Sequence, residues 1–256
     1  SEPGAVVCRV APSFLRLGSY EIFSAQGDIK TLKTLVDYTI ESFFPHLGAP
    51  GKQTYLDWFQ EVCERTADMV VDWMRVGFVH GVFNTDNTSV LGLTIDYGPY
   101  GWIDDYDPNW TPNTTDATGK RYRFGAQPQI AQWNLLQMAN AIYPLIDDAE
   151  ALRNILNDYV TVYTDKWQQM RADKLGLAEF KPADEELHQD LNRVMQLTET
   201  DMTLFYRHLA DVKVTDKKKT DDELLSPLMV AFYSSDALSQ ADKKDIANWV
   251  RDYLNR

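Results

Sequence analysis

The stretch from Thr54 to about Val76 places apolar residues at every third or fourth position, which is the spacing of one face of an α-helix. The stripe consists of Leu56, Trp58, Phe59, Val62, Cys63, Ala67, Val70, Trp73 and Met74. Gly77 follows directly, and glycine is common just past a helix C-terminus because it adopts the left-handed backbone conformation without strain. A long amphipathic helix is stabilised mainly by packing, so we predict a helix-rich globular domain.

Helical periodicity recurs on both sides of this stretch. It begins near Asp28 and stops before Pro45, and it returns from Pro128 almost to the last residue. We expect breaks in the second helical region near Pro144 and within residues 176–182, 211–222 and 234–239. The chain is therefore predicted to be mainly α-helical.

Two other segments predict extended structure. Residues 5–23 read as extended pieces that Pro12 and Gly18 interrupt. Residues 78–98 are rich in β-branched and small polar side chains, and their two short apolar runs are Ser89–Leu93 and Leu93–Ile95. We expect a loop, then a short β-hairpin or paired strands, and then a turn at Tyr97–Gly98–Pro99. The predicted fold class is accordingly mainly α with a small β component (α+β).

Charge and composition exclude several classes of protein. Acidic residues outnumber basic ones by 38 to 25, and the formal net charge of −13 opposes binding to a nucleic-acid backbone. No run approaches 18 apolar residues, so we expect neither a membrane span nor a membrane partner. Cys8 and Cys63 match no zinc pattern and form no disulfide framework, which indicates reduced thiols.

The cellular location is predicted from the same features. The N-terminal residues lack a basic region followed by an apolar run, and reduced thiols suit a cytosol-like compartment. We expect a cytoplasmic protein if the source is bacterial, or a mitochondrial one if it is eukaryotic. The chain starts without Met, so a targeting signal could lie upstream of Ser1.

The residues that carry chemistry lie in two short segments after the long helix. One is the polar loop HGVFNTDN at 80–87, and the other is Asp96–Tyr97–Gly98. Mg²⁺ and Mn²⁺ prefer oxygen ligands and usually take one or two carboxylates together with phosphate oxygens. Asp96 offers a carboxylate and Asn87 an amide oxygen, so we predict that these two residues hold a divalent metal.

The spacing of these residues matches a phosphoryl-transfer pattern. Protein kinases carry a loop H-x-D-x-x-x-x-N followed by Asp-Phe-Gly, and the Asn and the second Asp hold the metal. Asn87 likewise lies seven residues after His80. The base expected two residues after the histidine is Val82 here, and a carboxylate returns at Asp86. If the chain were an ordinary protein kinase, it would lack the catalytic base. If it is a variant of the kinase pattern, the carboxylate has moved from position 82 to Asp86.

Longer stretches resemble a known family. The run RTADMVVDWMRVGFVHGVFNTDNTSVLGLTIDYGPYGWIDDYDPNW at 65–110 is similar to the selenoprotein O family of kinase-like proteins. Two further segments resemble the same family, namely AVVCRVAPSFLRLGSYEIF at 5–23 and RYRFGAQPQIAQWNLLQMA at 121–139. The resemblance is dense over residues 1–140 and thinner in the helical remainder.

This resemblance implies an activity and a role for each residue. Members of the family transfer AMP from ATP, bound in an inverted orientation, to protein hydroxyl groups. The resemblance makes Asp86 the general base, Asn87 and Asp96 the ligands of Mg²⁺ or Mn²⁺, and Arg9 and Arg16 the clamp on the terminal phosphate. Two guanidinium groups suit that role because each is permanently charged and binds phosphate oxygens in a fork.

The resemblance also implies a domain organisation. We expect residues 1–256 to form one kinase-like C-lobe, with the active-site half in 1–140 and a helical extension in 141–256. The glycine-rich loop and the strand lysine of a kinase-like N-lobe are not found in the sequence, and neither is the C-terminal redox tail of the family. We therefore expect the isolated chain to be inactive.

Two other functions stay open on the residues alone. A kinase-like phosphotransferase would use the same loop and the same Asp-aromatic-Gly turn. A non-catalytic helical interaction domain would keep these residues as caps and turns, in which Asn and Asp are common. Isotopically labelled ATP would distinguish the first alternative, because only an adenylyltransferase transfers the α-phosphate.

Overall fold

A computed structural model describes residues 4–256 of the chain, and these residues fall into two compact units. The first unit consists of the residues up to Met69 together with Phe83–Tyr97 and Ala131–Tyr159. The second unit consists of Val70–Val82, Gly98–Ile130 and Val160–Arg256. Each unit is described separately below.

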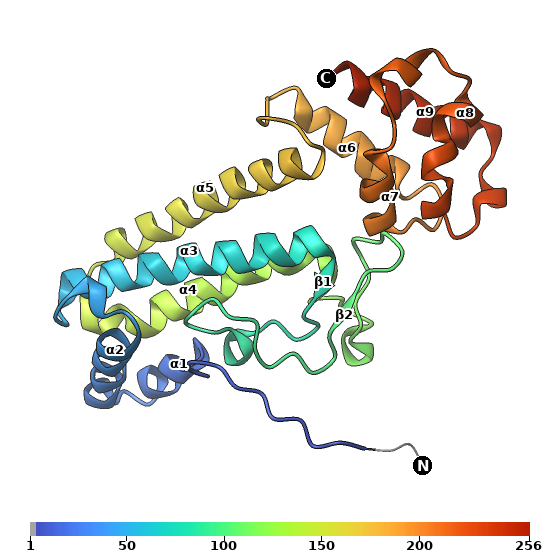
Figure 1. Ribbon diagram of the computed structural model, residues 1–256. Coiled ribbons are helices and arrows are strands. Elements are labelled where there is room, and N and C mark those ends of the chain that lie inside the picture. Colours follow the sequence, from blue (N-terminus) through green and yellow to red (C-terminus); the bar gives the residue numbers. More distant parts are fainter. Residues whose placement is uncertain (1–3) are drawn as a thin grey trace. The chain divides into compact units, whose positions relative to one another are not determined.

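Helices dominate the described chain (Figure 1). The α-helices are α1 (Gly18–Ala25), α2 (Ile29–Phe43), α3 (Lys52–Val76), α4 (Gln127–Ile146), α5 (Ala149–Lys174), α6 (Asp184–Val194), α7 (Met202–Leu209), α8 (Asp221–Leu225) and α9 (Gln240–Asn255). Strands β1 (Phe78–Val79) and β2 (Gly101–Trp102) pair antiparallel, with Phe78 opposite Trp102. The predicted class, mainly α with a small β component, is confirmed.

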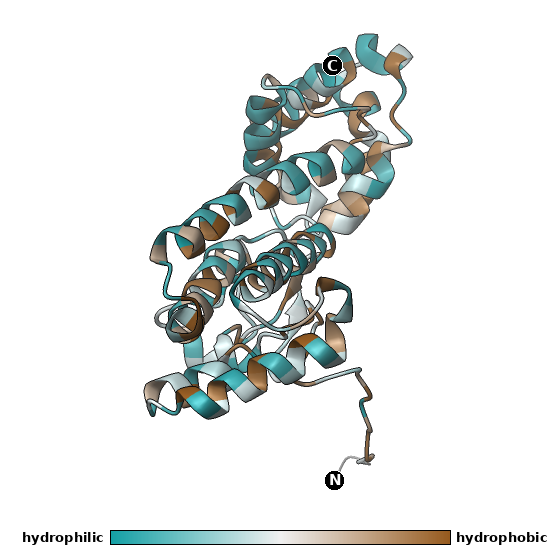
Figure 2. Cartoon of the chain, turned by 90° about the vertical axis from the view of Figure 1, so that its left-hand side faces the viewer, coloured by the Kyte–Doolittle hydropathy of each residue, from teal (hydrophilic) through white to brown (hydrophobic). Residues whose placement is uncertain are grey.

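The helices predicted from periodicity are present. Asp28 caps α2, because its side chain accepts a hydrogen bond from the backbone N–H of Thr31 at 3.0 Å. Helix α3 begins two residues before the predicted Thr54 and ends at Val76. Gly77 then has a φ of +73°, which is the left-handed conformation expected of a glycine at this position. Hydrophilic and hydrophobic residues are both present along the helices (Figure 2).

The predictions of extended structure were partly wrong. Residues 5–23 are extended only as far as Arg16, and Gly18 begins α1 instead of interrupting a strand. No strand lies within Ser89–Ile95, where the hairpin was expected, and β1 and β2 flank that segment instead. Ser89 pairs with Arg16 in an isolated antiparallel bridge. Period-two patterning shows that a segment can be extended, but it does not identify the partner.

The first unit has an aromatic core between α1, α2 and α3. The Tyr20 and Trp58 rings meet edge to face with centroids 5.4 Å apart, and the Tyr20 hydroxyl hydrogen-bonds Thr39 Oγ1 at 2.8 Å. Phe44 packs against Trp58 on one side, while the Arg65 guanidinium lies 4.6 Å from its ring centroid. These contacts fix α1 against the unit, and α1 begins at the candidate site.

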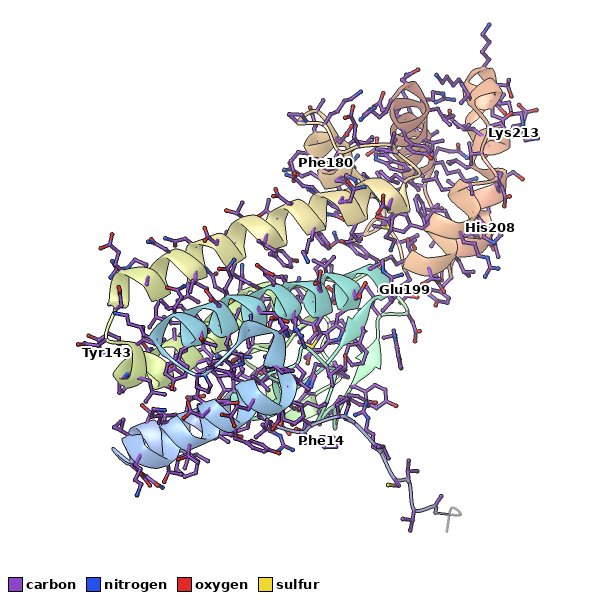
Figure 3. The ribbon with its side chains drawn as sticks, turned by 60° about the vertical axis from the view of Figure 1, so that its left-hand side comes forward. Phe14, Tyr143, Phe180, Glu199, His208 and Lys213 are labelled. Atoms are coloured by element: carbon purple, nitrogen blue, oxygen red, sulfur yellow. The ribbon has the colours of Figure 1, made fainter. Side chains whose placement is uncertain are left out.

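The second unit packs α6, α7 and α9 around buried rings. The Trp249 ring stacks on Tyr253 with centroids 5.7 Å apart, and its Nε1 donates a hydrogen bond to the Leu187 carbonyl at 2.9 Å. Phe205 lies 5.8 Å from Trp249, centroid to centroid. Phe180 precedes α6 on the connection from α5 (Figure 3). This unit therefore has its own apolar core.

Two further predictions concern the whole chain. Within residues 4–256, no helix is both long and apolar enough to cross a membrane. Both thiols are free, as predicted: Cys8 is exposed and Cys63 is buried. Burial raises the pKa of the Cys63 thiol well above its usual value, so this cysteine is an unreactive core residue.

Candidate functional site

The five residues predicted to carry chemistry all lie in the first unit. Arg9 belongs to the extended N-terminal segment, and Arg16 lies just before α1. Asp86 and Asn87 form part of a 3₁₀ turn, Thr85–Asn87, and Asp96 follows the loop after that turn. Arg9 and Asp86 are exposed, whereas the other three side chains are half-buried.

A buried asparagine holds the turn that carries Asp86 and Asn87. Asn134 on α4 is fully buried, and its Nδ2 donates hydrogen bonds to the Phe83 carbonyl and to Thr88 Oγ1, both at 3.0 Å. Thr88 Oγ1 donates in turn to the Asn84 carbonyl at 2.7 Å. These bonds fasten the loop immediately before and after the turn, which limits how far Asp86 can move.

The segment before α1 is bound to the same loop by backbone hydrogen bonds. The Leu17 N–H donates to the Thr88 carbonyl at 3.0 Å, and the Val90 N–H donates to the Leu15 carbonyl at 3.1 Å. These two bonds enclose the bridge between Arg16 and Ser89. A short antiparallel pairing between segments about 70 residues apart therefore brings Arg16 beside the turn.

The first residue of α1 makes room for Asp86. A Cβ atom placed on Gly18 would lie 2.1 Å from Oδ1 of Asp86 and 3.3 Å from its Cα. Gly18 is buried although Asp86 is exposed. Only glycine permits this approach, so Gly18 sets how closely the Asp86 carboxylate lies to the start of α1.

Arg16 and Asp96 form a two-point ion pair. Arg16 Nη2 donates to Asp96 Oδ1 at 3.0 Å, and Arg16 Nε donates to Asp96 Oδ2. The hydrogen bond to Asp96 raises the pKa of Arg16 against the opposing effect of partial burial, and the charges of Asp96 and Asp86 add to the rise. The guanidinium thus lies within the field of both carboxylates.

The Asp96–Tyr97 turn has an uncommon backbone and a second arginine partner. Asp96 has a φ of +52°, in the left-handed region that non-glycine residues seldom adopt outside turns and functional sites. The Arg9 guanidinium lies 3.7 Å from the centroid of the Tyr97 ring, in a cation–π contact. Both arginines expected to bind phosphate therefore contact this one turn.

The donor atoms are compatible with a divalent metal that is shared with a phosphate. Asp96 and Asn87 supply hard oxygen atoms of the kind that Mg²⁺ and Mn²⁺ prefer. Asp96 already binds one cation, the Arg16 guanidinium. No group of three or more His, Cys, Asp or Glu residues suited to a metal occurs in the part of the chain that the structure describes. Asp96 and Asn87 therefore suit a metal ion that takes its remaining ligands from substrate and water.

His80, from which the spacing to Asn87 was counted, has a structural role. It belongs to the second unit and is fully buried. Its backbone N–H donates to Gln127 Oε1 at 3.0 Å, and its ring lies 5.5 Å from the Trp73 ring, centroid to centroid. His80 therefore packs the segment that follows α3, and this packing accounts for its position seven residues before Asn87.

Two residues that position the loop were missed in the sequence. The sequence pattern around Gly18 predicts an interruption of extended structure, and Asn134 lies within a predicted helix. A polar residue among the apolar residues of a helix face was the available signal for Asn134, because a buried amide requires partners.

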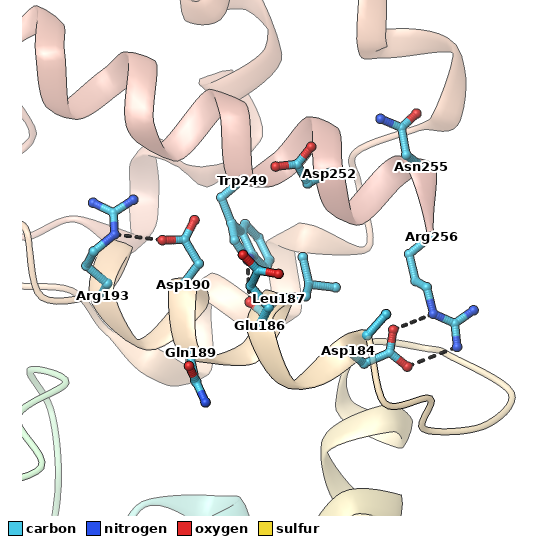
Figure 4. Close-up of a pocket in the computed structure, with 11 residues that line it drawn as sticks. Asp184, Glu186, Leu187, Gln189, Asp190, Arg193, Trp249, Asp252, Asn255 and Arg256 are labelled. Atoms are coloured by element: carbon cyan, nitrogen blue, oxygen red, sulfur yellow. Dashed lines mark hydrogen bonds and ion pairs between the residues drawn. The ribbon is translucent and has the colours of Figure 1, made fainter.

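A surface groove of about 660 Å³ in the second unit is a weaker candidate (Figure 4). It lies between α6 and α9, and its two arginines are committed to carboxylates. Arg193 Nε donates to Asp190 at 2.6 Å, and Arg256 binds Asp184 with two nitrogen atoms. The groove therefore offers no uncommitted guanidinium to an anionic ligand.

Comparisons with known proteins identify the family of the chain. Residues 1–256 match the profile of the family described as "Protein adenylyltransferase SelO". Curated relatives named "Protein nucleotidyltransferase YdiU" include proteins from Rhodopirellula baltica (51% identical), Flavobacterium johnsoniae (50%) and Aromatoleum aromaticum (52%). Each alignment covers 100% of this chain but only 48–49% of the relative. The chain thus spans about half the length of the curated relatives it matches.

Proposed function

The chain belongs to the protein adenylyltransferase SelO family, and on this premise we propose that it carries the catalytic loop and metal-binding residues of an enzyme that transfers AMP from ATP to protein hydroxyl groups. One observation carries the proposal. Two arginines, two carboxylates and an asparagine gather where the segment before α1 meets the loop 83–97. Cationic clamps and carboxylate metal ligands are the two parts that nucleotidyl transfer requires.

Asp96 and Asn87 are the proposed ligands of a Mg²⁺ or Mn²⁺ ion. When bound, such an ion neutralises charge on the phosphate oxygens of the nucleotide. Asp96 contributes the carboxylate, and the bonds from Asn134 restrain the loop that presents Asn87. The left-handed backbone at Asp96 turns the chain sharply at this ligand.

Arg9 and Arg16 are the proposed clamp for the terminal phosphate. The guanidinium of Arg16 binds the Asp96 carboxylate through two nitrogen atoms, and a phosphate presents oxygen atoms in a similar arrangement. We propose that nucleotide binding exchanges one partner for the other, so that Arg16 turns to phosphate while Asp96 becomes available to the metal. The ion pair keeps both groups oriented and charged until then.

Asp86 is the proposed general base. Its carboxylate is exposed, so it can meet a hydroxyl group on an approaching protein. In the proposed step the hydroxyl oxygen bonds to the α-phosphorus, the bond from that phosphorus to the bridging oxygen breaks, and pyrophosphate leaves. The hydroxyl proton passes to Asp86. Gly18 and the turn Thr85–Asn87 hold this carboxylate in place.

The proposed partners are ATP and proteins that bear accessible hydroxyl side chains. The net charge of −13 disfavours nucleic acid as an alternative partner. We propose a cytoplasmic location in a bacterial cell, or a mitochondrial one in a eukaryotic cell.

The proposal is tested with labelled ATP and the full-length protein that contains this chain. Label on the α-phosphate should enter acceptor protein in the presence of Mg²⁺ or Mn²⁺, while label on the γ-phosphate should leave with pyrophosphate. Transfer of γ-label alone would establish a phosphotransferase instead. Absence of metal-dependent nucleotide binding by the full-length protein would favour a non-catalytic interaction domain.

A further inference from the structure

A cavity of about 190 Å³ lies within the second unit, and its walls are largely aromatic and sulfur-containing. Tyr106, Trp167 and Tyr206 contribute rings, and Met74 and Met170 contribute thioethers. Methionine adapts its shape to a guest and makes favourable contacts with aromatic rings. These side chains therefore suit a flat apolar group, such as an aromatic ring.

The volume limits the size of the guest. A cavity of about 150 Å³ lined by apolar side chains is large enough to hold benzene. This cavity is somewhat larger, so it can accommodate one six-membered ring with a small substituent. A nucleotide or a peptide is too large for it.

Three basic side chains, Arg171, Lys174 and His188, also line the cavity, and no Asp or Glu of the described chain lines it with them. Lys174 Nζ donates to the Arg75 carbonyl at 2.8 Å and lies 4.0 Å from the centroid of the Tyr206 ring. Desolvation, followed by the charge of Arg75, lowers the pKa of Lys174 to about 8. No carboxylate within residues 4–256 pairs with this ammonium group.

Two buried nitrogen atoms at the cavity lack partners. His188 is only 2% exposed, and its Nε2 has no hydrogen-bond partner among the described residues. Arg171 is satisfied at one end, where Nη2 donates to Glu185 at 2.7 Å, but its Nε has no partner within the same residues. Buried polar atoms without a partner are rare in native proteins, and they commonly indicate a missing water, ion or ligand.

The charges indicate how many negative charges a ligand should carry. Glu185 balances the charge of Arg171 through their ion pair. Burial, followed by the charge of Arg171, lowers the pKa of His188 to about 4, so its imidazole is neutral near pH 7. Lys174 is thus the basic group at the cavity whose charge is not balanced by a carboxylate in the described chain, which favours a ligand with a single negative charge.

We propose that this cavity binds a monocyclic aromatic carboxylate. The ring occupies the space between the aromatic and methionine side chains. The carboxylate accepts hydrogen bonds from Arg171 Nε and His188 Nε2 and compensates the charge of Lys174. The cavity residues all belong to the second unit, so this site does not rest on the adenylyl-transfer proposal for the first unit.

Calorimetric titration of the full-length protein with benzoate tests the proposal, with benzyl alcohol as a neutral aromatic ligand of similar size. Saturable benzoate binding is expected, at least tenfold tighter than that of benzyl alcohol. If neither ligand binds, the cavity holds only water and the proposal is wrong. If both bind equally well, the basic side chains do not recognise the carboxylate and the proposal is wrong.

Variants identify the site. Lys174→Met keeps the apolar stem and removes the charge, so it should weaken benzoate binding at least tenfold and leave benzyl alcohol binding unchanged. Lys218→Met, at an exposed position of the same unit, serves as the matched control. Unchanged benzoate affinity in a folded Lys174→Met protein would overturn the proposal. If that variant does not fold, His188→Phe, which removes the Nε2 donor, should abolish benzoate binding in its place.

Discussion

Gly18 and Asp86 lie so close together that a methyl group on the glycine would approach Oδ1 of the aspartate to 2.1 Å. The contact joins the first residue of α1 to the proposed base, and neither residue can shift freely. Gly18 is buried, and the loop that carries Asp86 is fastened by Asn134. A side chain at position 18 must therefore displace the carboxylate.

Gly18→Ala should lower kcat in the full-length enzyme by about 10²-fold, because a positioned base contributes roughly that much to catalysis. The KM for ATP should change less, since the three atoms nearest to the added Cβ all belong to Asp86 and none to the arginines of the proposed phosphate clamp. Steady-state kinetics check both parameters. Gly51→Ala is the control, since a Cβ there meets no atom within 4 Å. A Gly18→Ala enzyme with wild-type kcat would contradict the role given to this contact.

Asp96→Ala should abolish metal-dependent transfer, because the proposed metal loses its one carboxylate ligand. Electron paramagnetic resonance measures Mn²⁺ binding directly, and it is done with nucleotide present. Asp72→Ala removes a surface carboxylate that pairs with Arg75 and should leave metal binding intact. Metal binding that survives in Asp96→Ala would show that the metal is held elsewhere.

Arg9→Ala should raise the KM for ATP by about tenfold or more and leave metal binding unaffected, because a guanidinium bound to phosphate contributes more than one kcal/mol. Initial rates over a range of ATP concentrations test this. The matched variant is Arg75→Ala, at an exposed arginine on α3. An unaltered KM would remove Arg9 from the phosphate clamp.

Asn134→Ala should reduce the free energy of unfolding by about 1–3 kcal/mol, because the buried Phe83 carbonyl loses its side-chain donor. Chemical denaturation gives this value. Asn154→Ala, at an exposed position on α5, should have an effect near zero. Equal stabilities of the two variants would mean that the amide does not hold the loop.

His188 should make stability depend on pH in mildly acidic solution. Burial, with the charge of Arg171 adding to it, lowers its pKa in the folded protein to about 4, from an ordinary value of 6.5. The unfolded chain then binds a proton between these values that the native protein does not. Stability should consequently fall as the pH drops from 6.5 to 4, by up to about 3 kcal/mol. Chemical denaturation between pH 4 and 6.5 gives the free energy of unfolding of wild type and of His188→Gln, and the two should depend on pH differently. The same pH dependence in both proteins would contradict the role of His188.

Local pattern predicted much of the secondary structure and three of the five proposed site residues. The apolar stripes of α2 and α3 repeat every three to four residues, so their bounds could be placed within about two residues. Asp86, Asn87 and Asp96 were found because oxygen ligands and a tight turn occur within a few residues of one another. Arg9 and Arg16 were found by resemblance alone, since two arginines seven residues apart indicate no particular chemistry.

The sequence by itself thus determined the helical class, the long helix α3, and the local segments that carry carboxylate and amide groups. Tertiary structure alone decided that Arg16 pairs with Asp96, that Gly18 lies under Asp86, and that β1 pairs with β2. The physical reason is the range of the interactions. Helical periodicity is a property of neighbouring residues, whereas these contacts join segments far apart in the chain and depend on which surfaces pack together.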